Sequence, residues 1–311
     1  MTLLFACINT IVIVAIAPLT IGIIRKGKAY LQNRRGASIF LPYLQIASLM
    51  RKEMTITEHS SWVFRSVPFV VLASALFITI AIPAVVIGVM PSALTNIFVV
   101  VGALAFGAVF LVMGGMDTAS TFGNMGSSRE MTLSALVEPV IVITLSTLAL
   151  LAGSWGVDGI LTNAVLNPWA DGGAFALTLC ALLLITLLEN ARYPVDNPAT
   201  HLELTMVHEA MILEYSGPYL ALLEYAAAIK LTVMAVFVAN LALPYGLVVA
   251  PVSLVGILVG ISLFCGKVGL AALVIALVET LVVKMRFYRM QEYVLLSLAF
   301  ALAGLSVALL T

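Results

Sequence analysis

The chain has 311 residues, of which 62% are hydrophobic and 10% charged, and its formal net charge is zero. A soluble domain is about one quarter charged, so the composition excludes an ordinary soluble enzyme. The even charge balance gives no reason to expect a nucleic-acid partner. Several apolar runs reach the roughly 20 residues that cross a bilayer as a helix. We therefore predict an all-α integral membrane protein, built as a single polytopic domain over residues 1–311.

About eight transmembrane helices are expected, at 3–24, 67–90, 95–114, 131–153, 173–190, 220–242, 253–283 and 291–310. All of the fifteen lysines and arginines except Lys230 and Lys267 lie in the connections that follow the odd-numbered spans. The positive-inside rule places these charged connections in the cytoplasm and both termini outside. We expect a multi-pass protein of the cell inner (cytoplasmic) membrane.

The first cytoplasmic connection, 25–66, begins with a cluster of basic residues. Arg25, Lys26 and Lys28 are typical of an orientation signal in contact with anionic lipids. The run Arg34-Arg35-Gly36 fits that explanation and docking to an acidic partner equally well. An apolar stripe within 40–53 predicts a short amphipathic helix in the membrane interface, with the lining of a cavity as the alternative.

Two features mark the fourth span. The segment 126–130, Gly-Ser-Ser-Arg-Glu, precedes it and places Glu130 in its first turn, where a carboxylate suits the helix dipole. Glu138 comes immediately before Pro139, which should kink the helix. A carboxylate about 12 Å along a span is costly unless it is paired or reached by water. We therefore expect Glu138 to take part in proton movement.

The cytoplasmic segment 189–219 is richest in titratable side chains, and we predict a charged loop and a helix there. Pro194 should end the preceding helix, and Asn197-Pro198 is typical of an N-cap followed by the first helical residue. Its titratable residues are Glu189, Arg192, Asp196, His201, Glu203, His208, Glu209 and Glu214.

The last three spans carry few charges. Glu224 and Lys230 are six residues apart and lie on different faces of one helix, so they are poorly placed to pair. Lys230 falls near the bilayer midplane and needs either a carboxylate from another span or stabilisation of its neutral form. Lys267 could snorkel to the outer boundary, and Glu279 adds one more acid.

Metal binding and catalysis by this chain alone are not expected. Cys7, Cys180 and Cys265 are isolated within apolar runs. His201 and His208 lie roughly 10 Å apart along a helix, too far to chelate one metal together, and a third ligand at useful spacing is lacking.

The charged motifs resemble those of the subunit 1 family of respiratory complex I. They read Glu189-x-x-Arg192-x-Pro194-x-Asp196, Glu203-Leu204, Glu214-Tyr215-Ser216-Gly217 and Glu224-Tyr225. Arg34-Arg35-Gly36, Lys52-Glu53, the segment 126–130 and Glu138 match further family positions in order. Complex I members carry glutamates where this chain has Ala199 and His201. The sequence of residues 196–210 is instead similar to that of the family branch found in membrane-bound energy-converting nickel–iron hydrogenases, which include formate hydrogenlyase.

This resemblance implies a membrane-anchor and coupling subunit that links the redox chemistry of a docked soluble arm to proton or sodium translocation. Its partners would be soluble hydrogenase large and small subunits with iron–sulfur proteins, and antiporter-like membrane subunits. The nickel–iron centre and the iron–sulfur clusters would lie in those partners. The implied docking residues are Arg34, Arg35, Arg129, Glu130 and Arg192. The implied proton-transfer residues are Glu138, Glu189, Asp196, His201, Glu203, His208, Glu209, Glu214, Glu224, Lys230 and Glu279.

Two alternatives remain at this point. One is the quinone-site subunit of a complex I-like dehydrogenase, which the departures at Ala199 and His201 disfavour. The other is a stand-alone secondary transporter with a midplane site at Glu224 and Lys230, although the two halves of the chain show no repeat of charges or broken helices.

Overall fold

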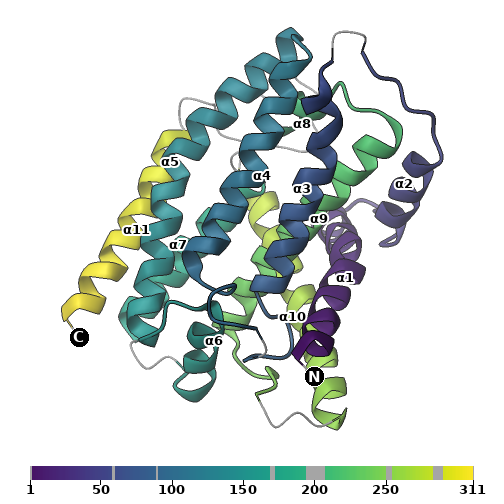
Figure 1. Cartoon of the computed structure of the whole chain (residues 1–311). Helices are drawn as coiled ribbons and strands as arrows, with labels where there is room; N and C mark the ends of the chain where they lie inside the picture. Colours follow the sequence, from purple (N-terminus) through teal and green to yellow (C-terminus); the bar gives the residue numbers. More distant parts are fainter. Residues whose placement is uncertain are drawn as a thin grey trace.

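The computed structural model describes residues 2–57, 60–88, 90–168, 172–193, 207–249, 254–282 and 290–310, and it is helical (Figure 1). Eight of its helices are long and apolar enough to cross a membrane, which confirms the predicted fold class. They are α1 (Thr2–Leu31), α3 (Trp62–Ala81), α4 (Ile97–Asp117), α5 (Thr121–Ala152), α7 (Gly172–Glu189), α9 (Gly217–Ala242), α10 (Leu254–Leu281) and α11 (Met290–Leu310). Three shorter helices are α2 (Leu41–Met50), α6 (Val157–Leu166) and α8 (His208–Ile212).

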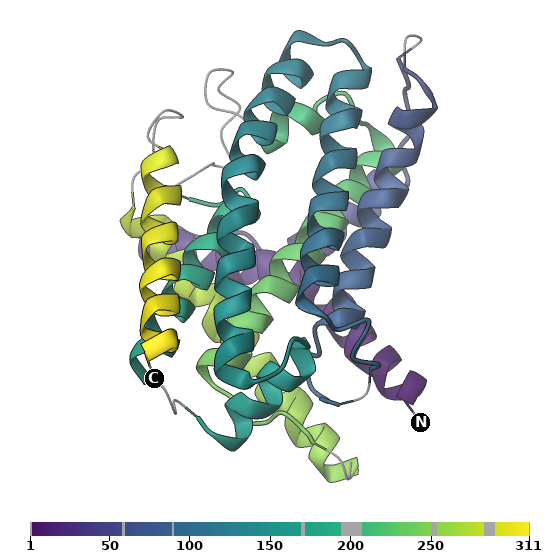
Figure 2. The ribbon, with the colours of Figure 1, turned by 60° about the vertical axis from the view of Figure 1, so that its left-hand side comes forward.

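The bundle has two distinct ends. Both termini lie at the same end as α6, whereas α8 lies at the opposite end (Figures 1 and 2). We call these the α6 end and the α8 end. Helix α1 is strongly tilted relative to α3, α4 and α5 (Figure 2). Helix α9 is the most deeply buried of the eight spans and packs against α1, α3, α7 and α10.

Several helix boundaries differ from the sequence prediction. Helix α1 continues to Leu31, so its last turns carry the first basic cluster, and the connection to α3 is 32–61 instead of 25–66. Helix α5 begins at Thr121, where the Ser120 hydroxyl accepts a hydrogen bond from the Gly123 N–H at 3.1 Å. Glu130 therefore lies in the third turn, and its predicted position in the first turn is wrong.

The second span ends earlier than predicted. Helix α3 stops at Ala81, and the next residues are not helical although they are apolar and buried from Ile82 to Ile87. The Asn9 side chain holds this segment: its oxygen accepts from the N–H groups of Val85 and Val86, both at 3.1 Å, and its amide donates to the Val86 carbonyl at 2.9 Å. These bonds satisfy backbone groups that would otherwise be buried without partners.

Helix α1 is joined to α2 and α9 at a proline. Pro18 has no N–H, so the Val14 carbonyl lacks its helical donor. The Tyr225 hydroxyl of α9 donates to that carbonyl at 3.0 Å, and the Tyr43 hydroxyl of α2 donates to the neighbouring Ala15 carbonyl. The short helix expected within 40–53 is thus tied directly to the bundle.

Candidate functional site

The main cavity lies at the α8 end and has a volume of about 760 Å³. Residues from α1, α2, α3, α4 and α9 line it, together with the ends of α7 and α10. Six basic and five acidic side chains face it: Arg25, Lys28, Arg34, Arg35, Arg192, Lys230, Glu130, Glu189, Glu209, Glu224 and Glu279, with His208 beside them. Ten of the residues that the sequence singled out therefore meet in one cavity. We call the eleven charged side chains the charged cluster.

Glu279 of α10 connects two separate parts of the charged cluster. One of its oxygens lies 2.8 Å from Lys28 Nζ and the other 3.4 Å from Arg192 Nη1. The Glu279 side chain is fully buried, whereas those of Lys28 and Arg192 are 21% and 11% exposed. Lys28 Nζ also lies 4.9 Å from the centre of the Tyr193 ring, a cation–π distance. Two cations thus compensate one buried carboxylate.

Lys230 pairs with a carboxylate from another span, as predicted. Its Nζ lies 2.7 Å from Glu189 Oε1 at the last residue of α7. Glu224, on the same helix as Lys230, does not pair with it, which also agrees with the sequence argument. Arg25 interacts electrostatically with Glu224 and with Glu209 of α8.

A water-sized hollow extends the charged cluster toward α5. It has a volume of about 10 Å³, roughly the space of one water molecule. Glu130, Ser134, Glu189 and Val207 are among its lining residues, and Glu130 and Glu189 line the main cavity as well. A single water there would be close to both carboxylates.

Six predicted residues are not part of this cavity lining. Glu138, Glu214 and Arg129 are described but do not line the cavity. Asp196, His201 and Glu203 lie outside the described residues, as does most of the helix predicted to begin at Asn197-Pro198.

The motif Glu214-Tyr215-Ser216-Gly217 has a structural role. The Tyr215 ring stacks on Phe64 at 4.0 Å, and its hydroxyl donates to the Phe64 carbonyl at 3.2 Å. Burial raises the pKa of this hydroxyl, with the charge of Asp117 acting in the same direction. The Ser216 hydroxyl exchanges hydrogen bonds with Thr55, and Gly217 (φ +53°) packs against the Glu53 carbonyl. The motif thus attaches residues 53–55 to the start of α9.

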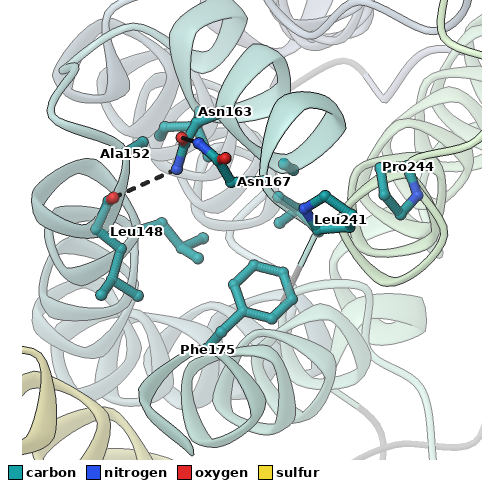
Figure 3. Close-up of a pocket in the computed structure, with 11 residues that line it drawn as sticks. Leu148, Ala152, Asn163, Asn167, Phe175, Leu241 and Pro244 are labelled. Carbon is teal, nitrogen blue, oxygen red and sulfur yellow. Dashed lines mark hydrogen bonds between the residues drawn. The ribbon is translucent and has the colours of Figure 1, made fainter. Parts of the chain in front are cut away.

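The α6 end contains a different kind of pocket. It has a volume of about 30 Å³, and its lining has no charged side chain. Figure 3 shows the Asn163 and Asn167 amides on the side opposite the Phe175 ring. Asn167 donates to the Asn163 side chain at 3.1 Å, and Asn163 donates to the Leu151 carbonyl at 3.3 Å. These bonds serve the packing of α6 against α5.

Lys267 is buried, and the expectation that it snorkels to the outer boundary is wrong. The residue is only 8% exposed, and its Nζ donates to the Asn240 side-chain oxygen at 2.9 Å. The Asn240 amide in turn donates to the Pro83 and Ala84 carbonyls at 3.4 and 3.2 Å. The lysine therefore belongs to the hydrogen-bond network around the non-helical segment 82–88.

Sequence reasoning missed Arg25 and Lys28 as members of the charged cluster. The two residues lie in a cluster of basic residues, which favoured their interpretation as an orientation signal. The first span was also predicted to end at residue 24, which placed both residues outside the membrane helix. Glu279 was the available signal, because a carboxylate in an apolar span requires a cation from elsewhere. Within the described part of the chain, no three His, Cys, Asp or Glu side chains are grouped closely enough to hold a metal ion.

The sequence matches a family model and two known proteins. A family model described as NADH dehydrogenase matches residues 3–309. Formate hydrogenlyase subunit 4 of Escherichia coli K12 is 30% identical over 286 residues, which cover 92% of each chain. Hydrogenase-4 component C of the same organism is 32% identical over 244 residues, covering 78% of this chain and 76% of that protein.

A solved structure has the same fold. It is a chain of the archaeal membrane-bound sulfane sulfur reductase, a respiratory membrane complex, with a TM-score of 0.83 and 16% identity over 99% of each chain. The family match spans nearly the whole sequence, and one relative of 30% identity covers 92% of it. The chain therefore belongs to the NADH dehydrogenase family, the complex I subunit 1-like family that its motifs resemble.

Proposed function

We propose that this chain is the membrane-anchor and coupling subunit of an energy-converting hydrogenase-type complex. In this role it links the redox chemistry of a docked soluble arm to the translocation of protons or sodium ions. The charged cluster carries the proposal, because it gathers eleven charged side chains, eight from six helices and three from connections, in an otherwise apolar protein. Two relatives named as parts of formate hydrogenlyase and hydrogenase-4 support the hydrogenase branch.

In this proposal the α8 end faces the cytoplasm and both termini lie outside. The connections at the α8 end carry the basic residues that the positive-inside rule assigns to the cytoplasm. The soluble arm would dock there through Arg34, Arg35, Arg129 and Glu130. Arg192 was expected to dock as well, but its ion pair with Glu279 favours a role in coupling.

Coupling would be electrostatic. A negative charge that arrives near the mouth of the cavity raises the proton affinity of nearby carboxylates. Protonation of Glu189 would release Lys230, and protonation of Glu279 would release Lys28 and Arg192. Because such groups titrate together, one charge at the mouth can shift protons at several positions within the membrane.

The redox cofactors would belong to the partners. We expect a nickel–iron centre and iron–sulfur clusters in the soluble large and small subunits and their iron–sulfur proteins. Antiporter-like membrane subunits would carry the translocated ions. This chain would bind no redox cofactor itself and would have no catalytic activity alone. The complex would lie in the cell inner (cytoplasmic) membrane.

A quinone-site subunit is the second candidate, because the cavity has an uncharged wall formed by α3 and α4. Quinone-dependent turnover of the purified complex would support it. The hypothesis of a stand-alone transporter is disfavoured, because Lys230 forms an ion pair with Glu189 and is not available to bind a substrate.

The proposal is tested by purifying the chain from native membranes and by measuring transport in vesicles. We expect soluble nickel–iron and iron–sulfur subunits to co-purify. We also expect Glu138→Gln and Glu203→Gln to lower ion transport per turnover while the complex still assembles. Isolation of the chain without redox partners, or unchanged transport in both variants, would contradict the proposal.

A further inference from the structure

The charged cluster occupies only part of the main cavity. The wall formed by α3 and α4 has no ionisable side chain and consists of Val71, Ser74, Ala75, Ile78, Leu104, Gly107, Ala108 and Leu111. A cavity that served only to hold water and protons would not need such a long apolar surface. This wall is therefore suited to a hydrocarbon ligand.

The apolar wall reaches deep into the bundle. Ile78 lies sixteen residues after Trp62, the first residue of α3, which corresponds to about 24 Å of helix. Val71, at the shallow end of the wall, lies about 13 Å from the same point. One leaflet contributes about half of a 30 Å hydrocarbon core. Measured from Trp62, the wall therefore begins near the bilayer centre, where the end of a lipid chain lies, and continues past it.

The mouth of the cavity carries arginines that form no close ion pair with a carboxylate among the described residues, although Arg25 interacts at longer range with Glu224 and Glu209. Arg34 and Arg35 are exposed at its rim, and Arg25 donates from Nη1 to the Gln45 side chain at 2.8 Å. Among the described residues, none of these three arginines has a carboxylate oxygen within 4.0 Å, in contrast to Lys28, Arg192 and Lys230. Arginine binds phosphate oxygens with strong charge-assisted hydrogen bonds.

Helix α2 is placed beside this mouth. Pro42, Gln45 and Ile46 line the cavity, whereas Phe40 and Leu44 on its outer side are 62% and 64% exposed. Exposed apolar side chains next to exposed arginines are typical of a helix at the membrane interface. The mouth would then lie at the depth of the phospholipid headgroups.

We propose that the main cavity is a binding site for one phospholipid from the bilayer, with its phosphate at Arg25, Arg34 and Arg35 and one hydrocarbon chain along the α3–α4 wall. A quinone would explain the apolar wall but not the unpaired arginines, because its headgroup carries no charge. A free anion would explain the arginines but not the wall. The site shares Arg25, Arg34 and Arg35 with the charged cluster, and Arg34 and Arg35 with the proposed docking face. Its α3–α4 wall is distinct from the ion pairs of Lys28, Arg192 and Lys230.

The test is to count the phospholipid retained by the purified complex, using native mass spectrometry and lipid extraction. The variant Ala108→Phe fills the wall, and Arg34→Gln with Arg35→Gln removes the headgroup charges. Both should lower retention roughly tenfold, equivalent to about 1.4 kcal/mol of binding. The matched controls are Val109→Phe, on the outward face of α4, and Arg51→Gln, a basic residue outside the cavity, and both should retain the lipid.

Each alternative occupant gives a different result. Retention that is unchanged in both cavity variants would overturn the proposal. Loss only in the arginine variant would indicate a surface headgroup site and would also overturn it, as would quinone co-purifying in place of phospholipid. Inorganic phosphate added to delipidated complex should displace little bound lipid, whereas full displacement would indicate a free-anion site. Thermal unfolding of the tagged chain confirms that each variant folds, because Arg34→Gln with Arg35→Gln is also expected to weaken docking of the soluble arm. Because lipid is counted directly on the tagged chain, failure here leaves the coupling proposal untouched.

Discussion

The two ends of the bundle are stabilised by different chemistry. At the α8 end, a cavity of about 760 Å³ is surrounded by ion pairs such as Glu189–Lys230. At the α6 end, the described residues pack around neutral amides, including Asn9 and Asn163, and one buried lysine, Lys267, and the pocket there is only about 30 Å³. Buried charge is costly unless it is paired or wetted, so charges gather where there is room for water. The comparison indicates that one end is built to change its charge state and the other to stay closed.

The largest effect is expected at Glu279, in the ion pairs of the α8 end. Glu279→Gln leaves Lys28 and Arg192 without their buried counter-charge, and breaking a buried pair in this way typically costs about 3–5 kcal/mol. Thermal unfolding of the purified complex should show a marked loss of stability. Glu292→Gln is the control, because Glu292 is exposed in the first turn of α11. Equal stability of the two variants would show that the Glu279 pairs matter little.

A smaller effect is expected where α9 begins. Gly217 has a φ of +53°, and a Cβ there would lie 2.7 Å from the Glu53 carbonyl oxygen. Gly217→Ala should therefore cost about 1–3 kcal/mol through backbone strain and should loosen residues 53–55. Faster proteolysis near Glu53 would report the change. Gly173→Ala is the control, since nothing lies within 4 Å of a Cβ at that position.

The contrast between the two ends predicts that replacing Lys267, at the α6 end, changes the stability only slightly. Lys267 is buried against Asn240 without a carboxylate partner among the described residues. Lys267→Met removes an uncompensated charge but leaves the Asn240 oxygen unpaired, so stability should change by less than about 1 kcal/mol. A loss as large as that of Glu279→Gln would mean that the α6 end also depends on a charge.

The smallest effect concerns pH. Burial raises the pKa of Asp158 in α6, and the backbone N–H groups of Gly88 and Met90 oppose that shift only in part. The folded state thus prefers the protonated acid. Its contribution to stability is present below the unfolded pKa of about 3.9 and is lost as pH rises through the folded value. Asp158→Asn should remove this decline, and identical pH–stability curves for the variant and the parent protein would contradict the assignment.

The sequence predicted the eight spans because hydropathy reports membrane crossing directly. It also predicted that Lys230 needs a carboxylate from another span, and Glu189 supplies it. It could not predict where α3 ends, since residues 82–87 are as apolar as a membrane-spanning helix but are not helical and are held by Asn9. The pairing of Lys28 with Glu279 was not predictable either, because contacts between distant helices depend on packing that no local pattern encodes.

The central claim is that the ion pairs of the charged cluster couple redox turnover to ion movement. The most direct measurement is the number of ions translocated per turnover in vesicles for Glu189→Gln, Lys230→Met and the double variant. Each single variant should lower this ratio roughly tenfold while turnover continues. The double variant should lower it no further than one single change. Ratios equal to that of the parent protein, or strictly additive losses, would contradict the account.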